Sequence, residues 1–435
     1  MDKLKRVVWL LALLGCASGS FAQYKLTIEQ MFDLAEQNSK SLKIFDIAHD
    51  EAVQAVKVAK NSRLPSVDLS LSVGYLGDGW MMDRDFSNGF KAPMPHFGNN
   101  FAIEASQIIY SGGAISNEII IAGLKERISG LSKENNRQDI RLLLVGNYLE
   151  IYKLNNQEIV FKENIKQTNR LLADIRAKRA EGIVLDNDIT RYELQLKSLE
   201  LSLVQIRNSR MIINNQLVSI LGLPHDTYIQ IDDCLQDTPV EEFSEEQWLQ
   251  TAILGSPLLK QAAIGVEISK KNEKLVRAER LPSLALFAGD KLDGPVIIEV
   301  PPINKNFNYW YVGVGMKFNL ASTYKTKRKS TLARLESKRV MEQKALLEEQ
   351  LQTDVNAAYI RFAESFTIYQ TQLKSLQLAM QNYEVVNNRY LNELVTITDM
   401  LDASNSKLNA ELQVSNSRIN ILFNYYKLKR IAGEI

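Results

Sequence analysis

Two aspartates are the residues whose type and spacing most clearly suggest chemistry. Asp399 and Asp402 lie in the stretch RYLNELVTITDMLDA, residues 389–403, and positions three apart share one face of a helix. Carboxylates held close together attract cations and raise one another's proton affinity. For Asp399 there is a structural alternative, because Thr396 three residues earlier makes TITD resemble a helix capping box. A cap does not explain Asp402.

The other reactive residue types form no catalytic or metal-binding pattern. His49, His96 and His225 fall in an expected helix, loop and linker, with no spacing suited to a metal. No Ser-His-Asp or Cys-His arrangement stands out. We therefore expect neither an enzyme nor a bound metal or cofactor.

The aspartate-bearing stretch has a counterpart about 211 positions upstream, RAEGIVLDNDITRYEL, which starts at Arg179. In each copy a long periodic segment ends at a short turn, and a second helix begins behind a Thr, Asn or Asp. Two helices joined in this way form a hairpin whose tip is the turn. The two turns consist of Gly182, Ile183 and Val184 in the first copy and Glu393, Leu394 and Val395 in the second.

The duplication extends over the whole chain. RLPS begins at Arg63 and again at Arg280, an offset of 217, whereas QIIYSGG at Gln107 corresponds to residues from Lys317, an offset of 210. The offset changes only where the first copy has the longer loop, as duplication followed by loop drift produces. We expect a first repeat over residues 23–225, an acidic linker over 226–245 and a second repeat over 246–435.

Within each repeat the spacing of the apolar residues changes. It is three or four positions in the expected helices and two positions in the expected strands. Val67 and Leu69, for example, alternate with Ser66 and Asp68, which predicts a strand with one apolar face. The repeats thus read as helix, two strands and a helical hairpin. The expected strands cover about residues 66–76, 100–110, 283–290 and 308–320, and the hairpin tips lie near 182–187 and 391–397.

The start of the chain indicates export. Residues 1–22 have a basic start, an apolar centre and small residues near the end, which is typical of a secretory signal peptide. Cleavage after Ala22 and a lipoprotein-type cleavage that leaves Cys16 lipidated are both open. Removing residues 1–22 takes away three of the 52 Lys/Arg and one of the 51 Asp/Glu, so the net charge becomes −1. A near-neutral chain gives no electrostatic basis for nucleic-acid binding.

Beyond residue 22 no run of about 18 apolar residues exists, so entry into a membrane would have to use strands. Four strands cannot close a barrel, and an open sheet edge in lipid leaves backbone groups unsatisfied. Three copies would supply twelve strands, which is within the range of outer-membrane barrels. The alternation of apolar and polar residues alone also fits a soluble β-sandwich. A soluble sheet, however, needs a compact layer packed on its apolar face, and helices of this length could not form one.

The order TIEQMFDLA, LPSVDLS, QIIYSGG, EGIVLDND and LVSILGLP, with its second copy, resembles the TolC-type outer-membrane efflux protein family. The resemblance implies an α+β membrane protein of the outer membrane. Three protomers would form a homotrimeric 12-stranded β-barrel, and their coiled-coil helices would form a tunnel in the periplasm. It also implies a periplasmic adaptor protein and an inner-membrane transporter as partners, with passive export as the function. A type I protein secretion duct and a coiled-coil scaffold without a pore remain alternatives.

The resemblance also implies roles for the tip residues. It places Asp399 and Asp402 on the inner face of the closed entrance, and Tyr390 and Asp188 where the family forms a hydrogen bond that holds the channel shut. Seam packing is the alternative for Tyr390. Val395 stands where the family often has an arginine, so closure here is expected to rest more on packing. The adaptor would dock on the six residues of the two turns, where Gly182 agrees with the family and Glu393 replaces its second glycine.

Overall fold

The computed structural model describes most of the chain, which folds into two compact units. The helical unit comprises Ser132–Leu259 and Leu347–Ile435 together with the residues up to Asp46, and the strand unit comprises Ile47–Leu131 and Lys260–Leu346. The expected signal peptide, including Cys16, lies outside the described residues. The structure describes residues 23–182, 184–231, 243–299 and 302–435.

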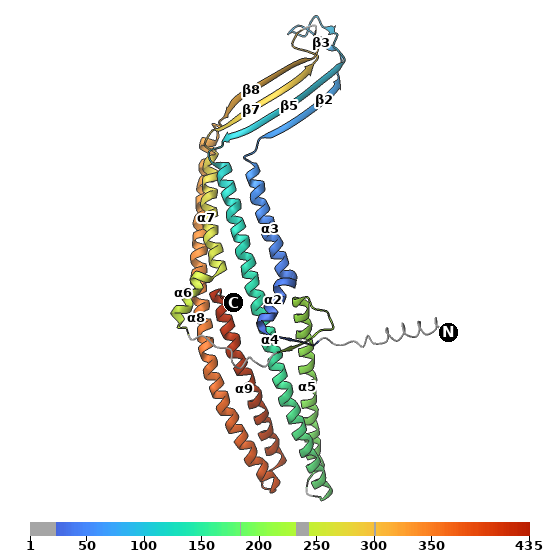
Figure 1. Cartoon of the computed structure of the whole chain (residues 1–435), viewed down its shortest axis with the longest axis vertical. Helices are drawn as coiled ribbons and strands as arrows, with labels where there is room; N and C mark the ends of the chain where they lie inside the picture. Colours follow the sequence, from blue (N-terminus) through green and yellow to red (C-terminus); the bar gives the residue numbers. More distant parts are fainter. Residues whose placement is uncertain (1–22, 183, 232–242, 300–301) are drawn as a thin grey trace, which may run out of the picture. The chain divides into compact units, whose positions relative to one another are not determined.

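The strand unit is built on one antiparallel sheet of four strands in the order β2-β5-β7-β8 (Figure 1). The central pair, β5 and β7, joins the two repeats. Each edge strand, β2 or β8, pairs with one neighbour in the described chain. β5 begins three residues earlier than expected because it pairs with β2 as far as Phe97, opposite Tyr75. β7 extends four residues further because its ladder with β5 continues to the pair Asn99 and Gly294. The strands are β2 (Ser66–Tyr75), β5 (Phe97–Tyr110), β7 (Ser283–Gly294) and β8 (Phe307–Lys317).

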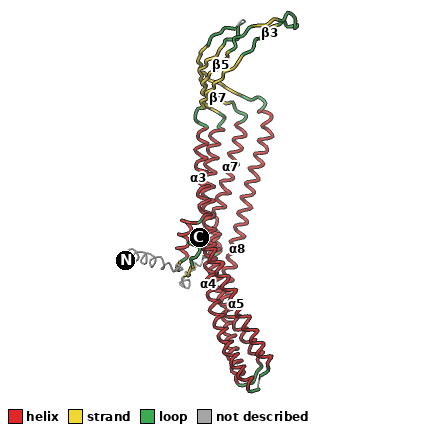
Figure 2. The backbone as a smooth tube through the Cα atoms, turned by 90° about the vertical axis from the view of Figure 1, so that its right-hand side faces the viewer, coloured by secondary structure: helices red, strands yellow, loops and turns green. Residues whose placement is uncertain are grey.

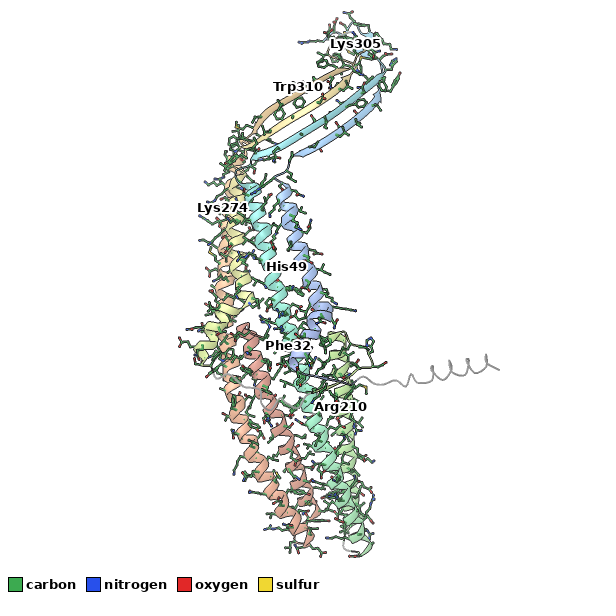
Figure 3. All side chains as sticks on the ribbon, in the orientation of Figure 1. Phe32, His49, Arg210, Lys274, Lys305 and Trp310 are labelled. Atoms are coloured by element: carbon green, nitrogen blue, oxygen red, sulfur yellow. The ribbon has the colours of Figure 1, made fainter. Side chains whose placement is uncertain are left out.

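The two faces of this sheet differ in polarity. On one face, Leu69 on β2 is 70% exposed, and Trp310 on β8, which is labelled in Figure 3, is 76% exposed. The apolar side chains of Val67, Leu71, Val312 and Val314 on the same face are also exposed. On the other face the register aligns Asp68 with Glu104 and Ser70 with Ala102. Side chains alternate between the faces along a strand, so the exposed apolar surface follows directly from the period of two. A short hairpin, β3 (Gly79–Met81) and β4 (Phe90–Ala92), lies in the first loop.

Long helices continue from the strands and pass from one unit into the other (Figure 2). α4 has 67 residues and α8 has 70, so at about 1.5 Å per residue each measures roughly 100 Å along its own axis. In the described residues, no helix is both long enough and apolar enough to cross a membrane. These helices are α3 (Lys40–Asn61), α4 (Ala114–Ala180), α7 (Pro257–Ala278) and α8 (Ser322–Leu391).

The shorter helices show the internal repeat in their caps. Thr27 caps α2 through a capping box with Gln30, and Ser244 caps α6 in the same way with Gln247. Each helix is eleven residues long and ends at a serine C-cap. The single first helix expected from the sequence is therefore divided at Ser39. The remaining helices are α2 (Ile28–Asn38), α5 (Asp186–Leu221), α6 (Glu245–Gly255) and α9 (Ile397–Ala432).

The expected acidic linker contains a strand. β6 (Tyr228–Ile231) pairs in parallel with β1 (Gln23–Leu26), and the side chains of Ile229 and Ile231 are buried. Asn214 of α5 fixes the start of this strand, because its amide donates to the Thr227 carbonyl and accepts from the Ile229 N–H, both at 2.9 Å. The acidic residues 232–242 of the same linker lie outside the described residues.

The core of the helical unit lies near these caps. One cluster surrounds Met31 and Leu217, and a second surrounds Trp248 and Leu428; all four side chains are fully buried. Burying side chains of this size contributes roughly 2–3 kcal/mol each. The two clusters therefore fix how the ends of α2, α5, α6 and α9 pack within this unit.

Candidate functional site

The first hairpin turns between α4 and α5. α4 ends at Ala180, and Gly182 adopts a left-handed backbone with φ of +81°. A Cβ at Gly182 would have no atom within 4 Å, so it is the backbone conformation and not the available space that favours glycine here. The turn is closed by Arg179, whose guanidinium donates two hydrogen bonds to Asp186 at 2.7 and 2.9 Å. Ile183 lies outside the described residues.

The second hairpin makes the same turn without a glycine. Glu393, which stands 211 positions after Gly182, also has a left-handed backbone with φ of +63°. A residue with a Cβ is strained in that region by about 1–2 kcal/mol. Leu394 beside it is 73% exposed, whereas Val395 is partly buried against the apolar cluster described below. The predicted docking residues thus lie on two turns of matching backbone, of which the second exposes a large apolar side chain.

The two hairpins pack against each other just behind their tips. All four helices α4, α5, α8 and α9 contribute to one buried apolar cluster, which we call the tip cluster. Polar contacts accompany it, since Arg191 donates to the Thr398 hydroxyl at 2.6 Å and Gln195 to the Asn405 side-chain oxygen at 2.7 Å. The tip cluster consists of Leu172, Ile175, Tyr192, Tyr390, Ile397 and Met400.

Asp399 caps α9. Its carboxylate accepts from the backbone N–H of Thr396 at 2.9 Å and from the Thr396 hydroxyl at 2.7 Å, and that hydroxyl accepts from the Asp399 N–H at 3.3 Å. These hydrogen bonds, the one from the hydroxyl most of all, hold the pKa of Asp399 below its usual range. Asp399 and Asp402 are both exposed, while Met400 and Ala403 between and beyond them are buried. A helix cap and a charged surface are thus compatible at Asp399, and the gate assignment stays a prediction.

Asp188 and Tyr390 line one cavity of about 490 Å³ together with Lys178, Val184 and Glu393. No hydrogen bond joins them in the described structure: Asp188 instead accepts from the Leu185 N–H at 3.3 Å, while the Tyr390 hydroxyl is buried without a partner. Burial and then the charge of Asp188 raise the pKa of Tyr390. The Lys178 ammonium lies 5.0 Å from the centre of the Tyr390 ring. Tyr390 thus packs within the tip cluster, as the seam-packing alternative predicts.

Tyr192 is a member of the tip cluster that the sequence did not single out. Its side chain is 2% exposed, and its hydroxyl also has no hydrogen-bond partner among the residues that the structure describes. Burial, and then the neighbouring Tyr390 and Tyr383, raise its pKa far above the usual value. Tyr192 lies in the first copy, near the start of the helix that follows the turn. Nothing in the local sequence pattern shows that it packs against the second copy.

The hairpin tips thus carry two turns and an exposed pair of carboxylates. Among the described residues there is no group of three or more His, Cys, Asp and Glu side chains that could hold a metal ion. The paired turns and the sheet with one apolar face agree with the arrangement expected from the sequence.

Residues 31–223 match the family model described as Outer membrane efflux protein. The match covers less than half of the chain and confirms the resemblance that its motifs indicated. No curated protein sequence matches the chain.

Solved structures show the same fold. The outer-membrane channel OprN superposes with a TM-score of 0.78 at 12% identity, over 94% of this chain and 90% of that one. The outer membrane protein VceC from Vibrio cholerae gives 0.78 at 15% identity, over 93% and 96%. The open state of the MtrE outer membrane channel from Neisseria gonorrhoeae gives 0.74 at 15% identity, over 93% and 88%. The mixed helix-and-strand fold of these channels therefore extends over both repeats of this chain.

Proposed function

We propose that this protein is the outer-membrane exit duct of a tripartite efflux pump. Three copies would join their sheets into a twelve-stranded barrel in the outer membrane, and their helical hairpins would continue the passage into the periplasm. Cargo would diffuse through without covalent change. A periplasmic adaptor would dock on the turns at Gly182–Val184 and Glu393–Val395, and an inner-membrane transporter would supply the energy.

One observation carries the proposal: a four-stranded sheet with one large exposed apolar face and two edge strands that each lack a second neighbour in the described chain. In lipid each unsatisfied backbone group at such an edge costs several kcal/mol, which closure removes. In water the same sheet would expose Val67, Leu69, Val312 and Val314 at once. Pairing β2 of one copy with β8 of the next satisfies both requirements.

A matched pair of arginine substitutions tests the assignment of the two faces. Leu69→Arg places a charge on the apolar face, where it costs about 2–4 kcal/mol at the middle of a bilayer. We expect it to abolish outer-membrane assembly. Ser70→Arg, one residue along the same strand, points to the opposite face and should assemble normally.

The duct itself is tested on detergent-extracted outer membranes. Native mass spectrometry should give a trimer, and planar bilayers should conduct ions once the trimer is inserted. A monomer, or a trimer that never conducts, would contradict the proposal and favour a coiled-coil scaffold.

The gate assignment rests on the exposed carboxylates of Asp399 and Asp402 and on the apolar packing behind them. Separation of the second hairpin from the first would break the tip cluster and widen the entrance. Val395 packs against this cluster where the family often has an arginine, which supports closure by packing in this protein.

A further inference from the structure

The polar face of the sheet carries an unusual row of aromatic rings. Successive ring centres lie 6.0 Å apart for Phe287 and Tyr311, 6.3 Å for Tyr311 and Tyr309, and 5.4 Å for Tyr309 and Phe307. These four residues come from β7 and β8, and the register places all of them on the face opposite to Trp310. We call them the aromatic track.

Two glycines leave space above the sheet that rings of the track occupy. A Cβ at Gly289 would lie 2.6 Å from the Tyr311 ring, and a Cβ at Gly313 would lie 2.6 Å from the Phe287 ring. The missing side chains leave room for each ring to lie over the backbone. Tyr311 is also fixed at its far end, because its hydroxyl donates to the Glu104 carboxylate at 2.5 Å.

Acidic groups accompany the track. The register places Asp68 beside Glu104 on β2 and β5, and Asp293 beside Phe307 on β7 and β8. Lys291 forms an ion pair with Glu104 at 2.9 Å and lies 5.8 Å from the Tyr311 ring, so this aromatic face already holds a cation. The Asp293 carboxylate accepts from the neutral amide of Asn100 at 2.5 Å, which does not compensate its charge.

The track ends in a cavity of about 640 Å³. Its volume lies within the range of sites for small organic molecules. Phe307 and Tyr309 line one side, Asp293 contributes a carboxylate, and the loop that follows β7 adds the apolar side chains of Ile297 and Ile298. Ile298 is 92% exposed, so apolar surface at this end is available to a solute.

We propose that the aromatic track and this cavity form a binding site for planar, apolar organic cations within the barrel. Aromatic faces attract cations through their quadrupole and stack on flat rings, while the carboxylate of Asp293 favours positive charge. Cations that bind at this site would be a class of cargo for the duct, so the inference rests on the proposed function. It would raise the local concentration of such solutes along the exit path.

The test uses ethidium as a planar cation and fluorescein as a planar anion, titrated by fluorescence anisotropy into the purified trimer in neutral detergent. We expect saturable ethidium binding that is weakened about tenfold by the double variant Phe307→Leu with Tyr309→Leu, since each exposed cation–π contact is modest. Asp293→Asn should weaken it about threefold, as loss of one partly screened charge predicts. Trp310→Leu is the matched control, because it removes an aromatic side chain from the same strand but from the opposite face.

Ethidium binding that is absent, or that falls equally in Trp310→Leu and in the double variant, would overturn the inference. So would fluorescein binding as tight as that of ethidium. Native mass spectrometry of each variant confirms the trimer, and conductance of the same sample in planar bilayers separates the two proposals. A conducting trimer that does not bind ethidium refutes the track alone, whereas a non-conducting one refutes the duct.

Discussion

Gly433 and Gly255 lie in direct backbone contact. A Cβ added to Gly433 would lie 2.8 Å from both the carbonyl carbon and the carbonyl oxygen of Gly255. Gly433 ends α9 with a left-handed backbone, φ of +79°. The first repeat has the same arrangement, since Gly222 ends α5 with φ of +65° and a Cβ there would lie 2.8 Å from the Asn38 side chain. A Cβ on either of these C-terminal glycines would therefore collide with the end of the neighbouring helix.

Gly255→Ala should therefore destabilise the helical unit. Its Cβ would overlap the Ala432 carbonyl, which belongs to backbone and cannot rotate away as a side chain could. Overpacking of this kind costs about 1–3 kcal/mol. Thermal unfolding followed by far-ultraviolet circular dichroism should show a lower Tm.

Gly123→Ala is the control for this substitution. Gly123 lies inside α4, and a Cβ there would meet no atom within 4 Å. Alanine in an open helical position stabilises by roughly 0.5–1 kcal/mol relative to glycine. Equal Tm values for the two variants would show that the contact at Gly255 is not tight.

Much of the fold was predictable because its signals are local. The alternation around Val67 and Leu69 depends only on neighbours in the sequence, and the structure has a strand there. β6 was missed for the opposite reason. It is four residues long, lies in an acidic segment, and is held by β1, whose residues precede it by more than 200 positions. A partner so distant in sequence leaves no periodic signal.

The site was predictable in its position but not in its contacts. The repeated turns located both tips, and TITD indicated the cap that Asp399 forms. The packing of Tyr192 against Tyr390 depends on how two hairpins from different repeats meet. The rings that lie over Gly289 and Gly313 likewise depend on strand register, which connects residues more than 20 positions apart.

The two roles of Asp399 can be separated by substitution. Asp399→Asn together with Asp402→Asn removes both charges but keeps a side-chain oxygen that can cap α9. If the carboxylates line the entrance, cation selectivity in planar bilayers should fall. Thr396→Ala removes the capping hydroxyl and keeps both charges, so it should loosen the helix start by about 1 kcal/mol and leave selectivity unchanged. The gate assignment fails if selectivity is the same in all three proteins.

The cap also has a defined pH dependence. The hydrogen bonds from Thr396 lower the pKa of Asp399, so the folded state binds its proton less readily than the unfolded chain does. The cap's contribution is therefore complete above the unfolded value of about 3.9 and is lost as pH falls through the lower folded value. Hydrogen exchange in the first turn of α9, corrected for intrinsic rates, should remain slow to below about pH 4. Loss of protection near pH 6 would contradict this.

Tyr192→Phe tests the buried hydroxyls of the tip cluster. Within the described part of the chain the Tyr192 hydroxyl has no hydrogen-bond partner, so its removal relieves an unsatisfied polar group while the ring packing is kept. We expect a stabilisation of about 1 kcal/mol and a channel at least as tightly closed as the wild type. Tyr192→Ala removes the ring as well and should cost about 3 kcal/mol and increase leak conductance. A leaky Tyr192→Phe channel would show that the hydroxyl has a partner in the trimer.

Glu158 lies at the centre of an ion cluster in the helical unit. Glu158 is 7% exposed between α4 and α5, and its carboxylate contacts Arg210 at 2.7 Å, Lys162 at 2.9 Å and Arg207 at 3.1 Å (Arg210 is labelled in Figure 3). Burial raises its pKa, but the hydrogen bonds from Lys162 and Arg207 and the charge of Arg210 outweigh burial, so the pKa lies below its usual range. The stabilisation is thus present above about pH 4.3 and is lost as pH falls further.

Glu158→Gln should lower stability at pH 7 by about 1–3 kcal/mol, less than for a fully buried pair because the arginines reach solvent. The difference from the wild type should shrink when thermal unfolding is repeated at pH 3. Glu150→Gln is the control, because Glu150 pairs with Lys153 at 2.5 Å near the surface of the same helix, where such pairs contribute less than about 1 kcal/mol. If Glu158→Gln loses as much stability at pH 3 as at pH 7, the cluster acts through packing and shape, because protonation removes only the ionic part.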